Sequence, residues 1–73
     1  MSNVNRKHWM ICNEKGYPTG LWVDRGGGSS SPLSERYKTK TEAYETLALY
    51  RTQEDEVMRK LKVFRIEMYE EQE

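Results

Sequence analysis

The small share of apolar residues constrains this chain more than any other feature of its sequence. Only 36% of its 73 residues are hydrophobic, and they include two tryptophans and five tyrosines. A chain of this length has room for one domain, and so small a core yields no more than about 3–5 kcal/mol of net stability. No run of about 18 apolar residues is present, so no membrane-spanning helix is expected. We therefore predict one small domain in which both tryptophans help to hold the core together.

The N-terminal residues and the single cysteine indicate a cytoplasmic protein. Residues 1–6 lack the apolar stretch of a secretion signal, so we expect none. Cys12 has no second cysteine with which to form an internal disulfide, which is typical of a reducing compartment. The predicted localisation is therefore the cytoplasm.

Short stretches rich in aromatic and β-branched residues predict strands in the first half of the chain. The polar residues 1–7 are expected to form a flexible N-terminal arm, followed by a strand over residues 8–12 and another over 21–24. Turn-forming residues between these two strands predict a hairpin. The glycine- and serine-rich residues 25–34 are interpreted as a flexible loop, and residues 35–38 as a third short strand.

The clearest local signal in the sequence is the start of a helix. Thr39 and Glu42 have the spacing of a capping box, in which the two side chains satisfy free backbone N–H groups at the helix end. Ala43, Leu47 and Tyr50 then recur at helical spacing. We expect this apolar stripe to pack on the sheet.

The segment after this helix fits two structures. Val57, Leu61 and Phe64 follow helical spacing, whereas residues 64–68 alternate between apolar and charged side chains as a strand does. No glycine, proline or asparagine occurs in this half of the chain to turn it back into a sheet. We therefore favour a helix over residues 55–66 and keep a strand as the alternative.

The predicted fold class is therefore α+β. It consists of a small antiparallel three-stranded sheet packed by one helix, with a C-terminal second segment that is helical or a strand. These elements make one domain over residues 8–69, and residues 70–73 follow as an acidic tail.

No combination of residues indicates catalysis or metal binding. His8 and Cys12 are the only histidine and cysteine, and on one strand they lie about 13 Å apart, too far for a nucleophile and its base. A zinc site needs about four ligands, mostly cysteine or histidine. Cys12 fits better as a small buried apolar residue, and His8 as a surface residue at a strand start. We expect no enzymatic activity, no cofactor and no metal.

The zero net charge of the chain conceals an uneven distribution along the sequence. Residues 1–40 carry seven basic and three acidic residues, whereas residues 41–73 carry five basic and nine acidic ones. A basic sheet half joined to an acidic helix half favours an oriented encounter with a charged partner. The alternative interpretation is an uneven scatter that has no functional meaning.

The preferred hypothesis is a non-enzymatic, protein-binding regulator. In its length and uneven charge the chain resembles the small early regulators with which lytic phages, those of Xanthomonas among them, bind host RNA polymerase. The resemblance implies an inhibitor of initiation that antagonises the sigma factor, together with antitermination, in the host cytoplasm. Aromatic rings and arginine often anchor protein interfaces. The residues predicted to contact the partner are Arg6, Lys7, His8, Trp9, Trp22 and Arg25.

The second hypothesis is a DNA-binding module. Residues 37–43 resemble the strand-to-helix step of the AP2-like domains of phage integrases, whose three-stranded sheet reads DNA. The resemblance implies that basic residues of the sheet half meet phosphates, and Lys7, Arg25, Arg36 and Lys38 are the candidates. The strands predicted for the hairpin depart from that pattern, because they are apolar where a DNA-reading strand carries arginine and lysine. Four phosphate contacts alone would be salt-sensitive and non-specific.

A third interpretation concerns assembly. The side chains of Phe64, Ile66 and Met68 would complete a thin core if two copies of the chain dimerised through them. The preferred hypothesis instead expects a monomer when the protein is free.

Overall fold

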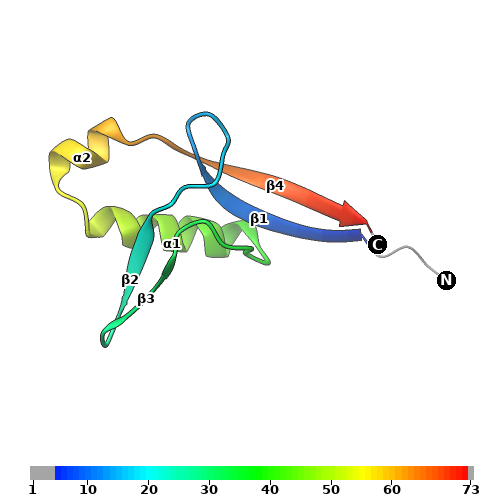
Figure 1. Cartoon of the computed structure of the whole chain (residues 1–73), viewed down its shortest axis with the longest axis horizontal. Helices are drawn as coiled ribbons and strands as arrows, with labels where there is room; N and C mark the ends of the chain where they lie inside the picture. Colours follow the sequence, from blue (N-terminus) through cyan, green and yellow to red (C-terminus); the bar gives the residue numbers. More distant parts are fainter. Residues whose placement is uncertain (1–4, 73) are drawn as a thin grey trace.

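In the computed structural model the described part of the chain is residues 5–72. The elements in chain order are β1 (Asn5–Asn13), β2 (Trp22–Gly26), β3 (Ser29–Pro32), α1 (Lys40–Thr52), α2 (Glu56–Leu61) and β4 (Phe64–Gln72). β1 and β4 form a long ribbon, β2 and β3 form a hairpin, and α1 packs along one side of both (Figure 1). No helix among these residues is long and apolar enough to cross a membrane.

The fold is α+β as predicted, but the predicted three-stranded sheet is wrong. The structure has two separate two-stranded antiparallel sheets. β1 pairs with β4 in an unbroken register from Asn5 opposite Gln72 to Asn13 opposite Phe64, so the predicted hairpin between residues 8–12 and 21–24 does not form. Residues 35–38 are not a strand either, since only Tyr37 among them bridges to β1.

The segment predicted as a flexible loop, residues 25–34, belongs largely to the β2–β3 hairpin. Gly26, Gly27 and Gly28 have φ angles of +89°, +60° and +81°, a backbone region that glycine adopts without steric cost. These glycines turn the chain, and Ser29–Pro32 then pairs with β2. The glycines that suggested a linker therefore make a tight turn between two strands.

The helix favoured over residues 55–66 is present in only half of that range. Only the six residues Glu56–Leu61 are helical, and the Asp55 carboxylate caps them by accepting a 2.8 Å hydrogen bond from the Met58 N–H. β4 begins at Phe64, so the alternating pattern was the correct signal there.

The predicted ends of the domain differ as well. Residues 5–7 of the predicted arm and residues 70–72 of the predicted acidic tail belong to β1 and β4. The other residues of these two segments lie outside the described part of the chain.

The start of α1 is confirmed. Thr39 Oγ1 accepts a 3.1 Å hydrogen bond from the Glu42 N–H, and the Glu42 carboxylate accepts one of 3.3 Å from the Lys38 N–H. Ala43 and Tyr50 are buried, and Leu47 packs against the same core, so the predicted apolar stripe is also confirmed.

Replacing Thr39 by alanine should lower the free energy of unfolding by about 1 kcal/mol, because the Glu42 N–H loses its partner. Urea unfolding followed by circular dichroism measures this loss. Thr41→Ala is the matched control, since Thr41 is an exposed first-turn residue of α1 and does not cap the helix. Equal losses in the two variants would contradict the assigned cap.

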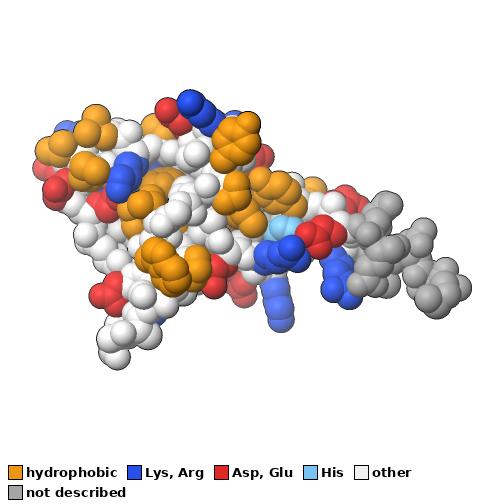
Figure 2. Space-filling model, viewed as in Figure 1, with side chains coloured by type: hydrophobic (Ala, Val, Ile, Leu, Met, Phe, Trp, Pro, Cys, Tyr) orange, Lys and Arg blue, Asp and Glu red, His pale blue; other side chains and the backbone are white. Residues whose placement is uncertain are grey.

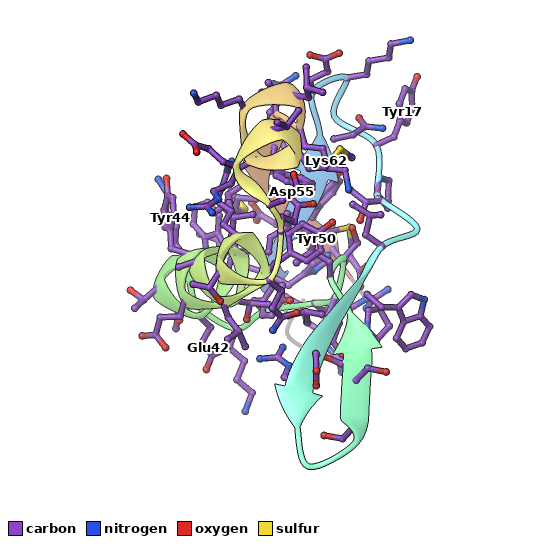
Figure 3. All side chains as sticks on the ribbon, turned by 90° about the vertical axis from the view of Figure 1, so that its left-hand side faces the viewer. Tyr17, Glu42, Tyr44, Tyr50, Asp55 and Lys62 are labelled. Atoms are coloured by element: carbon purple, nitrogen blue, oxygen red, sulfur yellow. The ribbon has the colours of Figure 1, made fainter. Side chains whose placement is uncertain are left out.

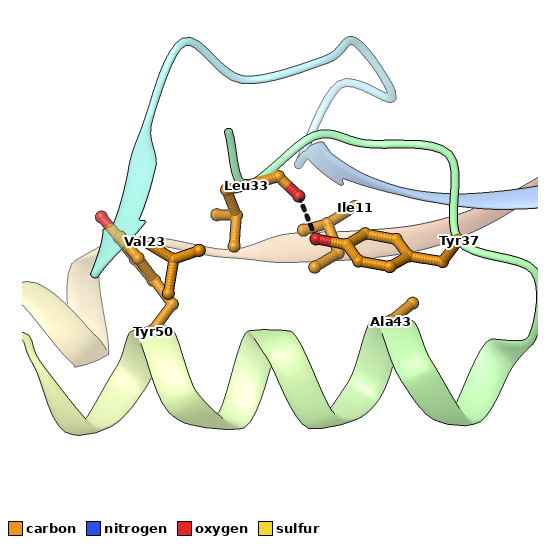
Figure 4. Packing of buried hydrophobic residues seen from close by; sticks show 6 residues of the cluster. All are labelled: Ile11, Val23, Leu33, Tyr37, Ala43 and Tyr50. Atoms are coloured by element: carbon orange, nitrogen blue, oxygen red, sulfur yellow. Dashed lines mark hydrogen bonds between the residues drawn. The ribbon is translucent and has the colours of Figure 1, made fainter. Parts of the chain in front are cut away.

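The core lies between α1 and the inner parts of the two ribbons (Figure 4). The Tyr37 hydroxyl donates a 2.8 Å hydrogen bond to the Leu33 carbonyl, and burial raises the pKa of Tyr37. Cys12 is fully buried, as predicted. The six buried residues of the cluster are Ile11, Val23, Leu33, Tyr37, Ala43 and Tyr50.

Candidate functional site

Four of the six predicted contact residues lie next to one another on β1. Arg6, Lys7, His8 and Trp9 occupy its outer half, which runs from the edge of the core at Trp9 to the part of the ribbon that extends beyond the core (Figure 1). Successive side chains of a strand point to opposite faces. Lys7 and Trp9 therefore share the face of Ile11, which packs under α1, whereas Arg6 and His8 lie on the opposite face. The sequence predicted one cluster, and the structure divides it between two faces.

His8 is held by an aromatic contact on the face away from α1. Its ring stacks on Tyr69, with the centroids 5.4 Å apart and the planes at 11°. The Tyr69 hydroxyl lies 3.6 Å from Cys12 Sγ, and this hydrogen bond, together with burial, raises the pKa of Tyr69. This face therefore presents a stacked pair of rings in which His8 is half-buried.

Trp9 connects β1 to α1 and to the segment before it. Its backbone N–H and C=O both bond to Tyr37, at 2.7 and 2.8 Å, and its ring packs partly against the core. The Lys40 ammonium lies 5.3 Å from the Trp9 ring centroid and 5.7 Å from that of Tyr44. Sequence reasoning missed Lys40 and Tyr44, although both belong to the first turns of the predicted helix.

The other two predicted contact residues are on β2, away from the outer half of β1 (Figure 1). Trp22 is 60% exposed, so its predicted role in the core is wrong. The Arg25 guanidinium lies 3.6 Å from the Glu35 carboxylate and donates a 2.8 Å hydrogen bond to Ser31 Oγ. The predicted set is thus divided between two strands and does not form one surface.

The candidates for DNA binding do not form the surface that an AP2-like module uses. The three-stranded sheet of such a module is missing from the described chain. Arg25 pairs with Glu35, and Arg36 forms a 3.1 Å ion pair with Glu71. Lys7 and Lys38 are exposed on different elements, β1 and the segment that precedes α1.

The predicted separation into a basic half and an acidic half does not hold in space. The register places Arg6 opposite Glu71 and Lys7 opposite Glu70, so the basic N-terminal strand lies beside the acidic C-terminal strand. Basic and acidic side chains accordingly alternate along the ribbon (Figure 2). The charge difference along the sequence becomes a mixed surface after folding.

An exposed apolar patch on and after α2 was missed by sequence reasoning. Val57, Leu61 and Val63 are 65%, 70% and 53% exposed. Leu61 and Val63 line a groove whose other wall is the turn after β1, around Pro18 and Leu21. Val57 and Leu61 follow helical spacing in the sequence, and their exposure shows that the spacing of a short helix does not fix which side is buried.

Beside this patch, a partly buried polar cluster joins α2 to α1. The Lys62 ammonium donates hydrogen bonds of 2.9 Å to Glu54 Oε1 and 3.1 Å to the Tyr50 hydroxyl (Figure 3). Burial and a hydrogen bond to Glu54 raise the pKa of Tyr50. Glu54 Oε2 is buried without a hydrogen-bond partner. The cluster positions α2 and is closed to solvent on the Glu54 side.

Neither a metal-binding group in the described residues nor a similar known protein assigns a function to this site. Within residues 5–72 no group of three or more histidine, cysteine, aspartate or glutamate side chains could hold a metal ion. Comparison with protein-family models, curated proteins and solved structures found no match.

Proposed function

We propose that the chain is a non-enzymatic regulator that binds host RNA polymerase through the outer half of β1. The observation that carries this proposal is the run of Arg6, Lys7, His8 and Trp9 on a ribbon that projects beyond the core. It offers cations and aromatic rings on both faces of a thin element, a combination common in protein interfaces. The choice of polymerase rests on the resemblance in length and charge to small phage regulators.

Binding alone is sufficient for both regulatory effects. A small protein that occupies a polymerase surface needed by the sigma factor lowers promoter engagement, so it inhibits initiation without any chemistry. The same protein, retained on the elongating enzyme, supplies antitermination. The partner is thus a large host protein in the cytoplasm, and the free chain acts as a monomer.

A pull-down from bacterial lysate with the tagged protein tests the proposal, and purified polymerase then gives the affinity. We expect polymerase subunits to be retained at low salt and Lys7→Gln to weaken binding at least fivefold, because one exposed interface cation is lost. Lys15→Gln removes the same charge from an exposed position in the turn after β1 and should leave the affinity unchanged. Retention of no polymerase subunit, or equal losses in both variants, would refute the proposal.

A further inference from the structure

The outer edge of β4 is an unpaired strand edge. Because both backbone groups of Trp9 bond to Tyr37, they point away from β4. Met68 lies opposite Trp9, so in an antiparallel pair its N–H and C=O point away from β1. The backbone N–H and C=O groups of every second residue of β4, those of Phe64, Ile66 and Glu70, likewise point away from β1. Within the described chain, no backbone hydrogen bond joins this edge to another segment.

This edge lacks two features that often prevent pairing with another chain, a proline and a β-bulge. Exposed edges are commonly protected by proline, by a bulge, or by a covering loop or helix. β4 runs for nine residues without proline, and its register with β1 is uninterrupted. It therefore has the length and regularity to accept one more strand.

A groove beside this edge can receive side chains of an added strand. It lies between α1 and β4 and is lined by Tyr44, Leu47, Ala48, Arg51 and Phe64. The side chains of Phe64 and Ile66 point toward α1 and pack against the core, and Met68 on the same face is 44% exposed. Side chains of an added strand that point to this face would lie over the groove and against Met68. The fit is best for apolar side chains.

The charge of the edge selects the kind of strand that it can accept. β4 carries Arg65 and three carboxylates, those of Glu67, Glu70 and Glu71. Arg65 pairs with Glu67 at 2.7 Å and Arg36 with Glu71 at 3.1 Å, whereas Glu70 is exposed at the outer end. A second β4 would bring the same carboxylates close together, which costs free energy. A basic segment would complement them.

We propose that the edge of β4 binds an extended, basic segment of a partner protein as a third strand of the β1–β4 ribbon. On one face the segment places apolar side chains over the groove between α1 and β4. On the other face it places lysine or arginine beside Glu67 and Glu71. The inference goes beyond the proposed function, because it assigns a second surface and its chemistry independently of the β1 contacts.

Peptide titration followed by NMR tests this inference on the whole chain. The probe is a nine-residue peptide in which lysine and valine alternate. We expect saturable shifts of the amide signals, and slower hydrogen exchange at Ile66, Met68 and Glu70 than in the free protein. The amides of Arg65 and Glu67 already face β1 and should keep their exchange rates. A peptide with methylated amide nitrogens on its pairing edge, and one with glutamate in place of lysine, should each bind at least tenfold more weakly.

Two substitutions locate the binding on the protein. Met68→Pro removes an outward N–H without removing a bond to β1, and should weaken binding at least tenfold. Met68→Ala keeps the N–H and should weaken it less than threefold. Ala48→Gln fills part of the groove from an exposed helix position and should weaken binding about fivefold.

Several results would overturn the inference. One is that the N-methylated peptide or the glutamate peptide binds as tightly as the lysine–valine peptide. Another is that a folded Met68→Pro variant binds the lysine–valine peptide as tightly as the wild-type protein does. A dimer in sedimentation that Met68→Pro dissociates would show a second copy to be the occupant. If Met68→Pro does not fold, the N-methylated peptide decides, because it leaves the protein unaltered. Loss of polymerase retention in Lys7→Gln bears on the proposed function alone.

Discussion

Replacing Ile11 by alanine should lower the free energy of unfolding by about 3 kcal/mol, the largest effect that we expect from a single substitution. Ile11 is fully buried and packs at the centre of a cluster of six buried residues. Alanine leaves a cavity that rigid neighbours on α1 and on both ribbons cannot fill. The total free energy of unfolding of a domain of this size is about 3–5 kcal/mol, so the substitution would remove most of its stability. Urea unfolding followed by tryptophan fluorescence measures the change.

Leu61→Ala is the matched control, because it removes the same number of carbon atoms from a side chain that is 70% exposed. We expect it to cost less than about 0.5 kcal/mol. Ile11→Val, with an expected loss of about 1 kcal/mol, keeps the comparison possible if the alanine variant does not fold. Equal losses for Ile11→Ala and Leu61→Ala would show that the assigned core is wrong.

The helical part of this fold was predictable because its signals are local. The cap at Thr39 and the stripe of Ala43, Leu47 and Tyr50 involve residues within a few turns of one another. Capping and periodicity act over that range, so they can be recognised in the sequence alone.

Strand pairing was not predictable, because the partners are far apart in the chain. β1 pairs with β4 across the whole length of the domain, whereas adjacent stretches suggested a hairpin. The absence of glycine, proline and asparagine favoured a helix at the C-terminus. In the structure the short helix α2 and the extended residues 62–63 return the chain to β1 without any of those residues. Local composition therefore does not exclude a return to a sheet when a helix performs the turn.

The candidate site was predictable only as a list of residues. Arg6 to Trp9 are adjacent in sequence and stay adjacent on β1, but Trp22 and Arg25 were added for their residue type alone and lie elsewhere. The open edge of β4 could not be foreseen, since it depends on which strand β4 pairs with. A surface that forms only when two distant strands pair can be predicted only once that pairing is known.

Replacing Glu54 by glutamine should lower the free energy of unfolding by about 2 kcal/mol at pH 7. The Glu54 side chain is 8% exposed, and that of Lys62, which donates to it at 2.9 Å, is 29% exposed. The amide keeps the shape of the side chain but leaves the partly buried Lys62 ammonium without a counter-charge. Urea unfolding at pH 7 and at pH 3 measures this contribution.

The pH dependence of the free energy of unfolding distinguishes the contribution of the Glu54 charge from that of the shape of its side chain. Burial raises the pKa of the Glu54 carboxyl, but hydrogen bonds from Tyr50 and Lys62 outweigh it, so the net pKa lies below its usual range. Hydrogen bonds to Glu54 and Tyr50 raise the pKa of Lys62. A lowered acid pKa stabilises the fold above the unfolded value of about 4.3 and ceases to do so as the pH falls through the folded pKa. A raised lysine pKa stabilises it below about 10.4 and ceases to do so as the pH rises through the folded pKa.

The difference between wild type and Glu54→Gln should therefore be largest between about pH 5 and pH 10 and should become small in acid. Glu56→Gln is the control, because Glu56 is 78% exposed and meets Lys60 at 3.4 Å on the surface of α2. Exposed pairs of this kind contribute less than about 0.5 kcal/mol. An equal loss for Glu54→Gln at pH 3 and pH 7 would mean that packing, and not the Glu54–Lys62 charge pair, holds α2 to α1.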